Sequence, residues 1–108
     1  MTEPADAESP PPEQHPPEGA IVRVVPIVNS KGLHARAAAQ FVLTVEKFDA
    51  DVTVTRGHET VGGTSIMALM MLAAGPGTSI TVAATGPQAA EVMDALEALV
   101  AGRFGEEE

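Results

Sequence analysis

The order of short strand-like and helix-like segments constrains this chain more than any other feature of its sequence. Four stretches have the β-branched content or the apolar alternation of short strands: 20–28, 51–55, 60–62 and 78–84. Three others have periodic or nearly continuous apolar residues typical of helices: 34–48, 66–74 and 88–101. Turns rich in glycine and proline separate several of these segments. The order β-α-β-β-α-β-α predicts an α+β domain, with three helices on one face of a four-stranded, mainly antiparallel sheet.

The charged residues divide the chain into a domain and two acidic tails. The length of 108 residues indicates one domain. The net charge of −9 comes mostly from the acidic ends of the chain. Residues 1–19 hold five acids, no base and most of the prolines, so we expect a disordered tail before a domain at 20–105. Residues 106–108 are a second acidic tail.

Composition also excludes several classes of function. The chain has no cysteine for a disulfide or a thiolate metal site, and no tryptophan or tyrosine to stack on nucleic-acid bases. No apolar run approaches the roughly 20 residues of a membrane span, and no secretory signal stands at the start. We therefore expect a cytoplasmic protein that binds neither nucleic acid nor metal and does not insert into a membrane.

The segment 30–41 has the features of an anion site. A turn at residues 29–32 leads into an alanine-rich helix, and His34 stands at the junction. Unpaired N–H groups and partial positive charge favour anions at a helix start. The positive charge of Arg36 in the first turn destabilises the helix by roughly a few tenths of a kcal/mol. A residue with such a local cost suggests a role in binding a ligand.

His34 has the properties of a nucleophile for phosphoryl transfer. The positive end of a helix favours a neutral imidazole, whose lone pair can attack phosphorus. The N–H groups and Arg36 would then stabilise the phosphoryl dianion, and Gly32 would let a partner approach closely. From these residues alone, a histidine serving as a plain surface cap remains the alternative.

Two motifs resemble the HPr family of histidine phosphocarriers, which serve the phosphoenolpyruvate-dependent phosphotransferase system of bacteria. The first is Gly32-Leu33-His34-Ala35-Arg36, followed by small residues and Gln40-Phe41. The second is Thr64-Ser65-Ile66-Met67 with its Met- and Leu-rich helix, about thirty residues later, as in the family. The sequence Ala84-Thr85-Gly86-Pro87-Gln88 continues the match and is similar to the nitrogen-related branch.

The resemblance implies a fold and a set of roles. The fold is the open-faced β-sandwich. His34 would accept a phosphoryl group on Nδ1 from phosphorylated enzyme I and pass it to an enzyme IIA component, while Arg36 pairs with the phosphoryl oxygens. Ser65 matches the serine that HPr kinase/phosphorylase modifies in many relatives, although helix capping also explains a serine there. The chain would act without a cofactor, as a monomeric co-substrate of its partners rather than as an enzyme. Ala37 departs from the usual proline, which leaves the start of the helix less rigid.

The segment 66–74 is apolar on nearly every side, so one sheet cannot bury all of it. Flexible methionines suit a surface that binds several partners in turn. We predict that Ile66, Met67 and Met70 flank His34 and form a docking patch, with Leu69 and Leu72 in the core.

Two other functions are compatible with these patterns. One is a small regulatory module that binds a metabolite or a partner through Ser65 and the methionines. The other is a small phosphatase or acylphosphatase, which would need a water-positioning group; Asn29 alone stands near His34 in the sequence. For a carrier, the sequence leaves open whether sugar uptake or nitrogen and carbon regulation lies downstream.

Overall fold

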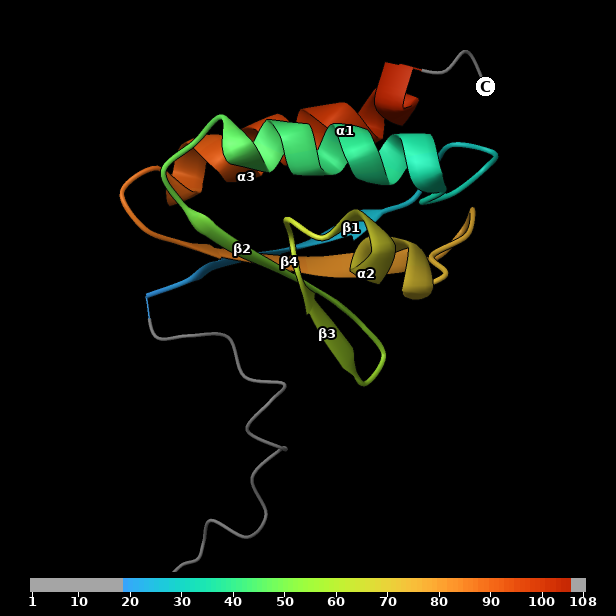
Figure 1. Ribbon diagram of the computed structural model, residues 1–108, viewed down its shortest axis with the longest axis horizontal. Coiled ribbons are helices and arrows are strands. Elements are labelled where there is room, and N and C mark those ends of the chain that lie inside the picture. The colour runs from blue at the N-terminus through green and yellow to red at the C-terminus, as the bar shows by residue number, and fades with distance from the viewer. Residues whose placement is uncertain (1–18, 106–108) are drawn as a thin grey trace, which may run out of the picture.

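A computed structural model describes residues 19–105, and its four strands form one sheet covered by helices on one face (Figure 1). The elements follow in the order β1 (Ile21–Pro26), α1 (Ala35–Glu46), β2 (Asp51–Arg56), β3 (Glu59–Gly62), α2 (Ile66–Met71), β4 (Ser79–Thr85) and α3 (Ala89–Ala101), then a 3₁₀ turn, η3 (Arg103–Gly105). This is the predicted β-α-β-β-α-β-α order and the open-faced sandwich, so both are confirmed.

The strands lie in the spatial order β1-β4-β2-β3, and every neighbouring pair is antiparallel. β1 is therefore an edge strand, which tolerates Pro26 because a proline there need not donate a ladder hydrogen bond. Because β1 leads directly into the turn before α1, residues 27–34 lie at one end of the sheet, next to its edge strand.

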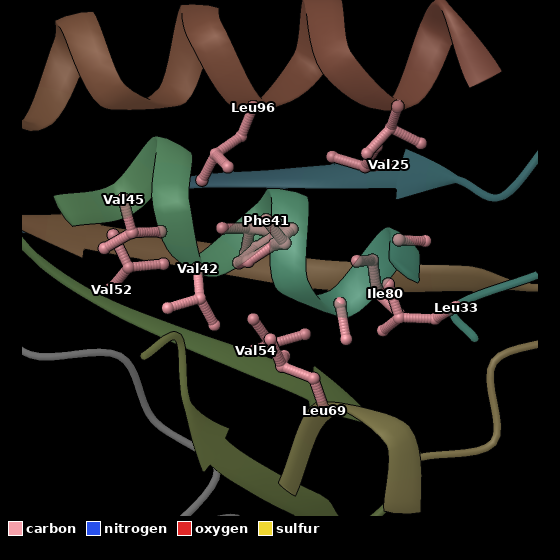
Figure 2. Close-up of a cluster of buried hydrophobic side chains, with 14 of the residues drawn as sticks. Val25, Leu33, Phe41, Val42, Val45, Val52, Val54, Leu69, Ile80 and Leu96 are labelled. Atoms are coloured by element: carbon pink, nitrogen blue, oxygen red, sulfur yellow. The ribbon is translucent and has the colours of Figure 1, made fainter. Parts of the chain in front are cut away.

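One apolar core lies between the helices and the sheet (Figure 2). Helix α1 buries Phe41 and Val45, β2 buries Val54, and α2 contributes Leu69. These residues follow the three- and four-residue spacing on the helix and the two-residue spacing on the strand that the sequence predicts. Leu69 and Leu72 are both buried, as expected. Short as it is, α2 is therefore tied to the same core as the longer helices.

Two segments differ from the sequence prediction. Helix α2 ends at Met71, not at residue 74, because Ala73 adopts a left-handed conformation with φ of 55° that stops the helix. Beyond α3, the 3₁₀ turn buries Phe104 in the core, where the prediction had only a helix end at Gly102. Both differences come from tertiary packing, which local periodicity does not report.

The predicted tails at 1–18 and 106–108 lie outside the described residues. Among residues 19–105, none of the helices has the length and apolar content needed to cross a membrane.

Candidate functional site

The turn that leads into α1 is held by its own hydrogen bonds. The N–H of Gly32 donates to the carbonyl of Asn29 at 3.2 Å, and the buried Asn29 side chain donates from Nδ2 to the carbonyl of Gly32 at 2.9 Å. Gly32 has φ of +65°, a conformation that glycine adopts without steric cost. The turn therefore has one well-defined path into the helix.

The same turn is packed against the segment that follows α2. The N–H of Leu33 donates to the carbonyl of Ala74 at 2.9 Å, and the side chain of Leu33 is buried. A Cβ added to Gly32 would lie 2.6 Å from that carbonyl oxygen and 2.9 Å from Cα of Gly75. Gly32 is thus required by a close backbone approach as well as by its φ. This contact joins parts of the chain about forty residues apart.

His34 is the N-cap of α1, as predicted. Its backbone is extended (φ −80°, ψ −177°), and its side chain makes no capping hydrogen bond to the helix. Instead, Nδ1 lies 3.0 Å from the carbonyl oxygen of Gly32. A carbonyl can only accept, so this hydrogen bond requires that Nδ1 carries the proton. The half-buried imidazole is consequently held at the start of the helix rather than directed into solvent.

The start of α1 is suited to an anion. The first intrahelical hydrogen bond runs from the N–H of Ala38 to the carbonyl of His34 at 2.8 Å, so the N–H groups of residues 35–37 precede it. The first turn contains no acidic residue, and it exposes the side chain of Arg36. Ala37, in the same turn, is fully buried. Backbone N–H groups and a guanidinium are therefore available next to the imidazole.

A shallow pocket of about 210 Å³ lies beside His34. Its walls come from the turn before α1 and from the segment after α2: Lys31, Leu33, His34, Ala73, Ala74 and Gly75. No sequence pattern assigned the residues after α2 to the site, and Lys31 had no role of its own within the predicted segment 30–41. The Gly75-Pro76-Gly77 turn indicated only that a helix stops there. No local pattern shows that this turn meets a helix start far away in the chain.

Ser65 begins α2, where its hydroxyl accepts a hydrogen bond from the N–H of Ala68 at 3.2 Å. The predicted cap is therefore confirmed, whereas phosphorylation of Ser65 stays a prediction. The exposed side chains of α2 include those predicted for docking. Ile66 is 41% exposed, Met67 71% and Met70 42%. Met71, which was not among the residues predicted for docking, is 73% exposed. These four residues are called the α2 patch below.

The α2 patch connects to the histidine site through its backbone. α2 packs against α1, and it leads through Ala73 and Ala74 into the wall of the pocket beside His34. Arg56 fixes that end of α2 by donating from a guanidinium nitrogen to the carbonyl of Leu72 at 3.0 Å. Within residues 19–105, no group of three or more His, Asp or Glu residues is arranged to hold a metal ion.

A fold of this kind, with an imidazole at a helix N-terminus beside basic side chains, defines a class of small α+β phosphocarriers. The chain belongs to the HPr family: residues 21–102 match the family model described as the PTS HPr component phosphorylation site.

Individual relatives agree. The phosphocarrier protein HPr of Cupriavidus necator is 46% identical over 88 residues, which is 82% of this chain and 99% of the relative. The phosphocarrier protein NPr of Shewanella violacea is 39% identical over 86 residues, covering 80% of this chain and 94% of NPr. The crystal structure of an HPr from Thermoanaerobacter tengcongensis aligns with a TM-score of 0.78 at 36% identity, over 82% of this chain and 99% of that one. The predicted family and fold are therefore confirmed, and the chain is a phosphocarrier of the phosphotransferase system.

Proposed function

We propose that this phosphocarrier accepts a phosphoryl group on Nδ1 of His34 from phosphorylated enzyme I and donates it to an enzyme IIA component. The observation that carries the proposal is the placement of the imidazole: His34 caps α1 while its ring is held by the Gly32 carbonyl. The arrangement puts the imidazole next to a positive helix end. The partners follow from membership of the HPr family, and the chain acts as their co-substrate.

Transfer to Nδ1 has to begin with the loss of the hydrogen bond between Nδ1 and the Gly32 carbonyl. Nδ1 carries a proton while it donates to that oxygen, so its lone pair is not available to phosphorus. The ring must leave the carbonyl, give up the Nδ1 proton to solvent and take one on Nε2. Nδ1 then forms the P–N bond as the bond between phosphorus and the donor histidine of enzyme I breaks, its electron pair staying with that donor. Phosphorylation therefore selects the other tautomer of His34.

The groups at the start of α1 stabilise the product. A phosphoryl dianion on Nδ1 would be repelled by the Gly32 carbonyl and attracted by the N–H groups of residues 35–37 and by Arg36. A rotation of the imidazole thus moves Nδ1 away from the Gly32 carbonyl and toward the N–H groups at the start of α1. Donation to enzyme IIA is the reverse step, with the acceptor's nitrogen as the incoming nucleophile and His34 as the leaving group.

The α2 patch serves as the docking surface for these partners. It is uncharged and its three methionines are flexible, so it can adapt to enzyme I and to enzyme IIA in turn. Its backbone leads into the pocket beside His34, so a partner seated on α2 lies near the reacting nitrogen.

The proposal is tested by incubation with phosphoenolpyruvate and the cognate enzyme I. Wild type is expected to gain one acid-labile phosphate, whereas His34→Ala gains none. His58→Ala is the matched control, because His58 lies in the β2–β3 turn outside the site, and it should be labelled like wild type. An unlabelled wild type, with an enzyme I shown to be active on another HPr, would favour a partner-binding module and contradict a carrier.

We further infer that Ser65 is a regulatory phosphorylation site for an HPr kinase/phosphorylase. A phosphate on this N-cap would lie at the positive end of α2 and leave the helix intact, while adding about two negative charges beside the α2 patch. Incubation with a cognate kinase and ATP should add one phosphate to wild type and none to Ser65→Ala. An unchanged mass of wild type contradicts this inference without affecting the role of His34.

A further inference from the structure

We infer that Lys31 is a second phosphoryl-binding cation of this chain, in addition to Arg36. The inference rests on the proposed phosphorylation of His34 and extends that site to the pocket beside it. The ligand is the phosphoryl group on the imidazole, whose oxygens carry about two negative charges.

The pocket places Lys31 and His34 in one concave surface. Both residues line the same space of about 210 Å³, and residues 73–75 form the rest of its wall with Leu33. Arg36 does not line this pocket. A phosphoryl group on the pocket side of the ring would therefore meet the ammonium of Lys31, and Arg36 would act from the surface of the helix.

The turn between the two side chains fixes their relation. Gly32 is held on both sides, by the hydrogen bonds to Asn29 and by the close approach of Ala74 and Gly75. Leu33 is anchored through its buried side chain and its hydrogen bond to Ala74. Lys31 and His34 thus project from the two ends of a rigid connection of two residues. A long lysine side chain then has little backbone freedom to lose when it contacts a phosphoryl oxygen.

The charges around the pocket favour this role over a structural ion pair. The lining residues include no aspartate or glutamate, and the salt bridges from Arg23 to Asp94 and Glu97 lie elsewhere, on the sheet edge. A lysine that lines an uncharged concavity beside the reacting histidine has a dianion as its natural counter-charge. Because Lys31 is exposed, solvent screens the attraction, so we expect a graded effect on phosphorylation and not an all-or-none one.

The test uses the full chain and compares its two lysines. Each of wild type, Lys31→Gln, Lys31→Arg and Lys47→Gln is equilibrated with enzyme I and a fixed ratio of phosphoenolpyruvate to pyruvate, and the phosphorylated fraction is measured. Lys47 is the matched control, since it is an exposed lysine at the other end of α1. Lys31→Gln should lower the phosphorylation equilibrium constant by about two- to fivefold at low salt, and less at high salt. Lys31→Arg and Lys47→Gln should match wild type.

A second readout separates phosphoryl binding from a structural role. Removing Lys31 should change the ³¹P chemical shift of the phosphoryl group on His34 at neutral pH, because the phosphoryl oxygens lose a contact. Lys47→Gln should leave that chemical shift unchanged. If wild type is labelled but Lys31→Gln and Lys47→Gln agree in both measurements, the inference about Lys31 is wrong and the carrier function stands. If wild type is not labelled at all, the carrier function fails and the inference fails with it.

Discussion

Within residues 19–105, two turns carry a histidine, and they differ in how much of the fold holds them. The turn before α1 contains Gly32 and His34, and the turn between β2 and β3 contains Gly57 and His58. The two glycines have nearly the same backbone conformation, with φ of +65° and +64°. A Cβ on Gly32 would collide with the segment after α2, whereas a Cβ on Gly57 would have nothing within 4 Å.

The difference shows where the fold builds a site. A hairpin needs a glycine such as Gly57 only to reverse the chain. The turn at Gly32 also has to hold an imidazole against a helix end, a pocket and the end of α2. Similar local sequences can therefore have different functions, and the long-range contacts decide which histidine lies in a site.

The largest expected effect comes from replacing each glycine by alanine. Gly57→Ala should lower the free energy of unfolding by about 1–2 kcal/mol, since it introduces only an unfavourable φ. Gly32→Ala has the same φ and a backbone collision in addition, so we expect a further loss of about 1–3 kcal/mol. Urea unfolding of the two variants measures the difference. Equal losses would show that the contact between Gly32 and Ala74 does not hold the site.

A charge on the α2 patch should have the next largest effect, on partner affinity rather than on stability. Met67→Glu places a carboxylate in the proposed docking surface and should raise the KM of the carrier with enzyme I about tenfold. Val24→Glu is the control, because Val24 is 66% exposed on the edge strand β1, close to the 71% of Met67. Its KM should stay within twofold of wild type. Equal effects of the two substitutions would contradict docking on α2.

A smaller effect is expected at Ala73, in the pocket wall. Ala73 adopts φ of 55°, which an alanine adopts only at a cost, so Ala73→Gly should stabilise the fold by about 0.5–1 kcal/mol after the entropy of glycine is counted. Ala74→Gly is the matched control: Ala74 is buried and is not among the residues with positive φ, so it should destabilise. Thermal unfolding of both variants gives the two signs. Destabilisation by Ala73→Gly would show that the positive φ of Ala73 does not strain the backbone.

The sequence predicts those parts of the molecule that depend on local periodicity. Apolar spacing identified the buried face of α1, and the Ser65 cap follows from the residue preference of helix starts. A turn at residues 29–32 followed by an alanine-rich run predicts His34 at the helix junction. These features are set within one turn or one helix, so a single sequence contains the signal.

Other parts of the site depend on contacts that no local pattern encodes. Alanine is a strong helix former, so periodicity extended α2 through Ala73. The left-handed Ala73 instead precedes Ala74, whose carbonyl accepts a hydrogen bond from Leu33. The pocket lined by Lys31 and Ala74 likewise forms where two segments distant in the sequence meet. The hydrogen bond from His34 to Gly32 joins near neighbours, but its geometry depends on the long-range contact that fixes Gly32.

We propose that His34 carries the phosphoryl group on Nδ1, the nitrogen that donates to Gly32 in the resting protein. ¹⁵N and ³¹P NMR of the ¹⁵N-labelled protein, before and after treatment with enzyme I and phosphoenolpyruvate, distinguishes the two ring nitrogens. We expect a protonated Nδ1 at rest, and a ¹⁵N–³¹P coupling to Nδ1 with the proton on Nε2 afterwards. A coupling to Nε2, or a phosphate on any residue other than His34, would contradict it.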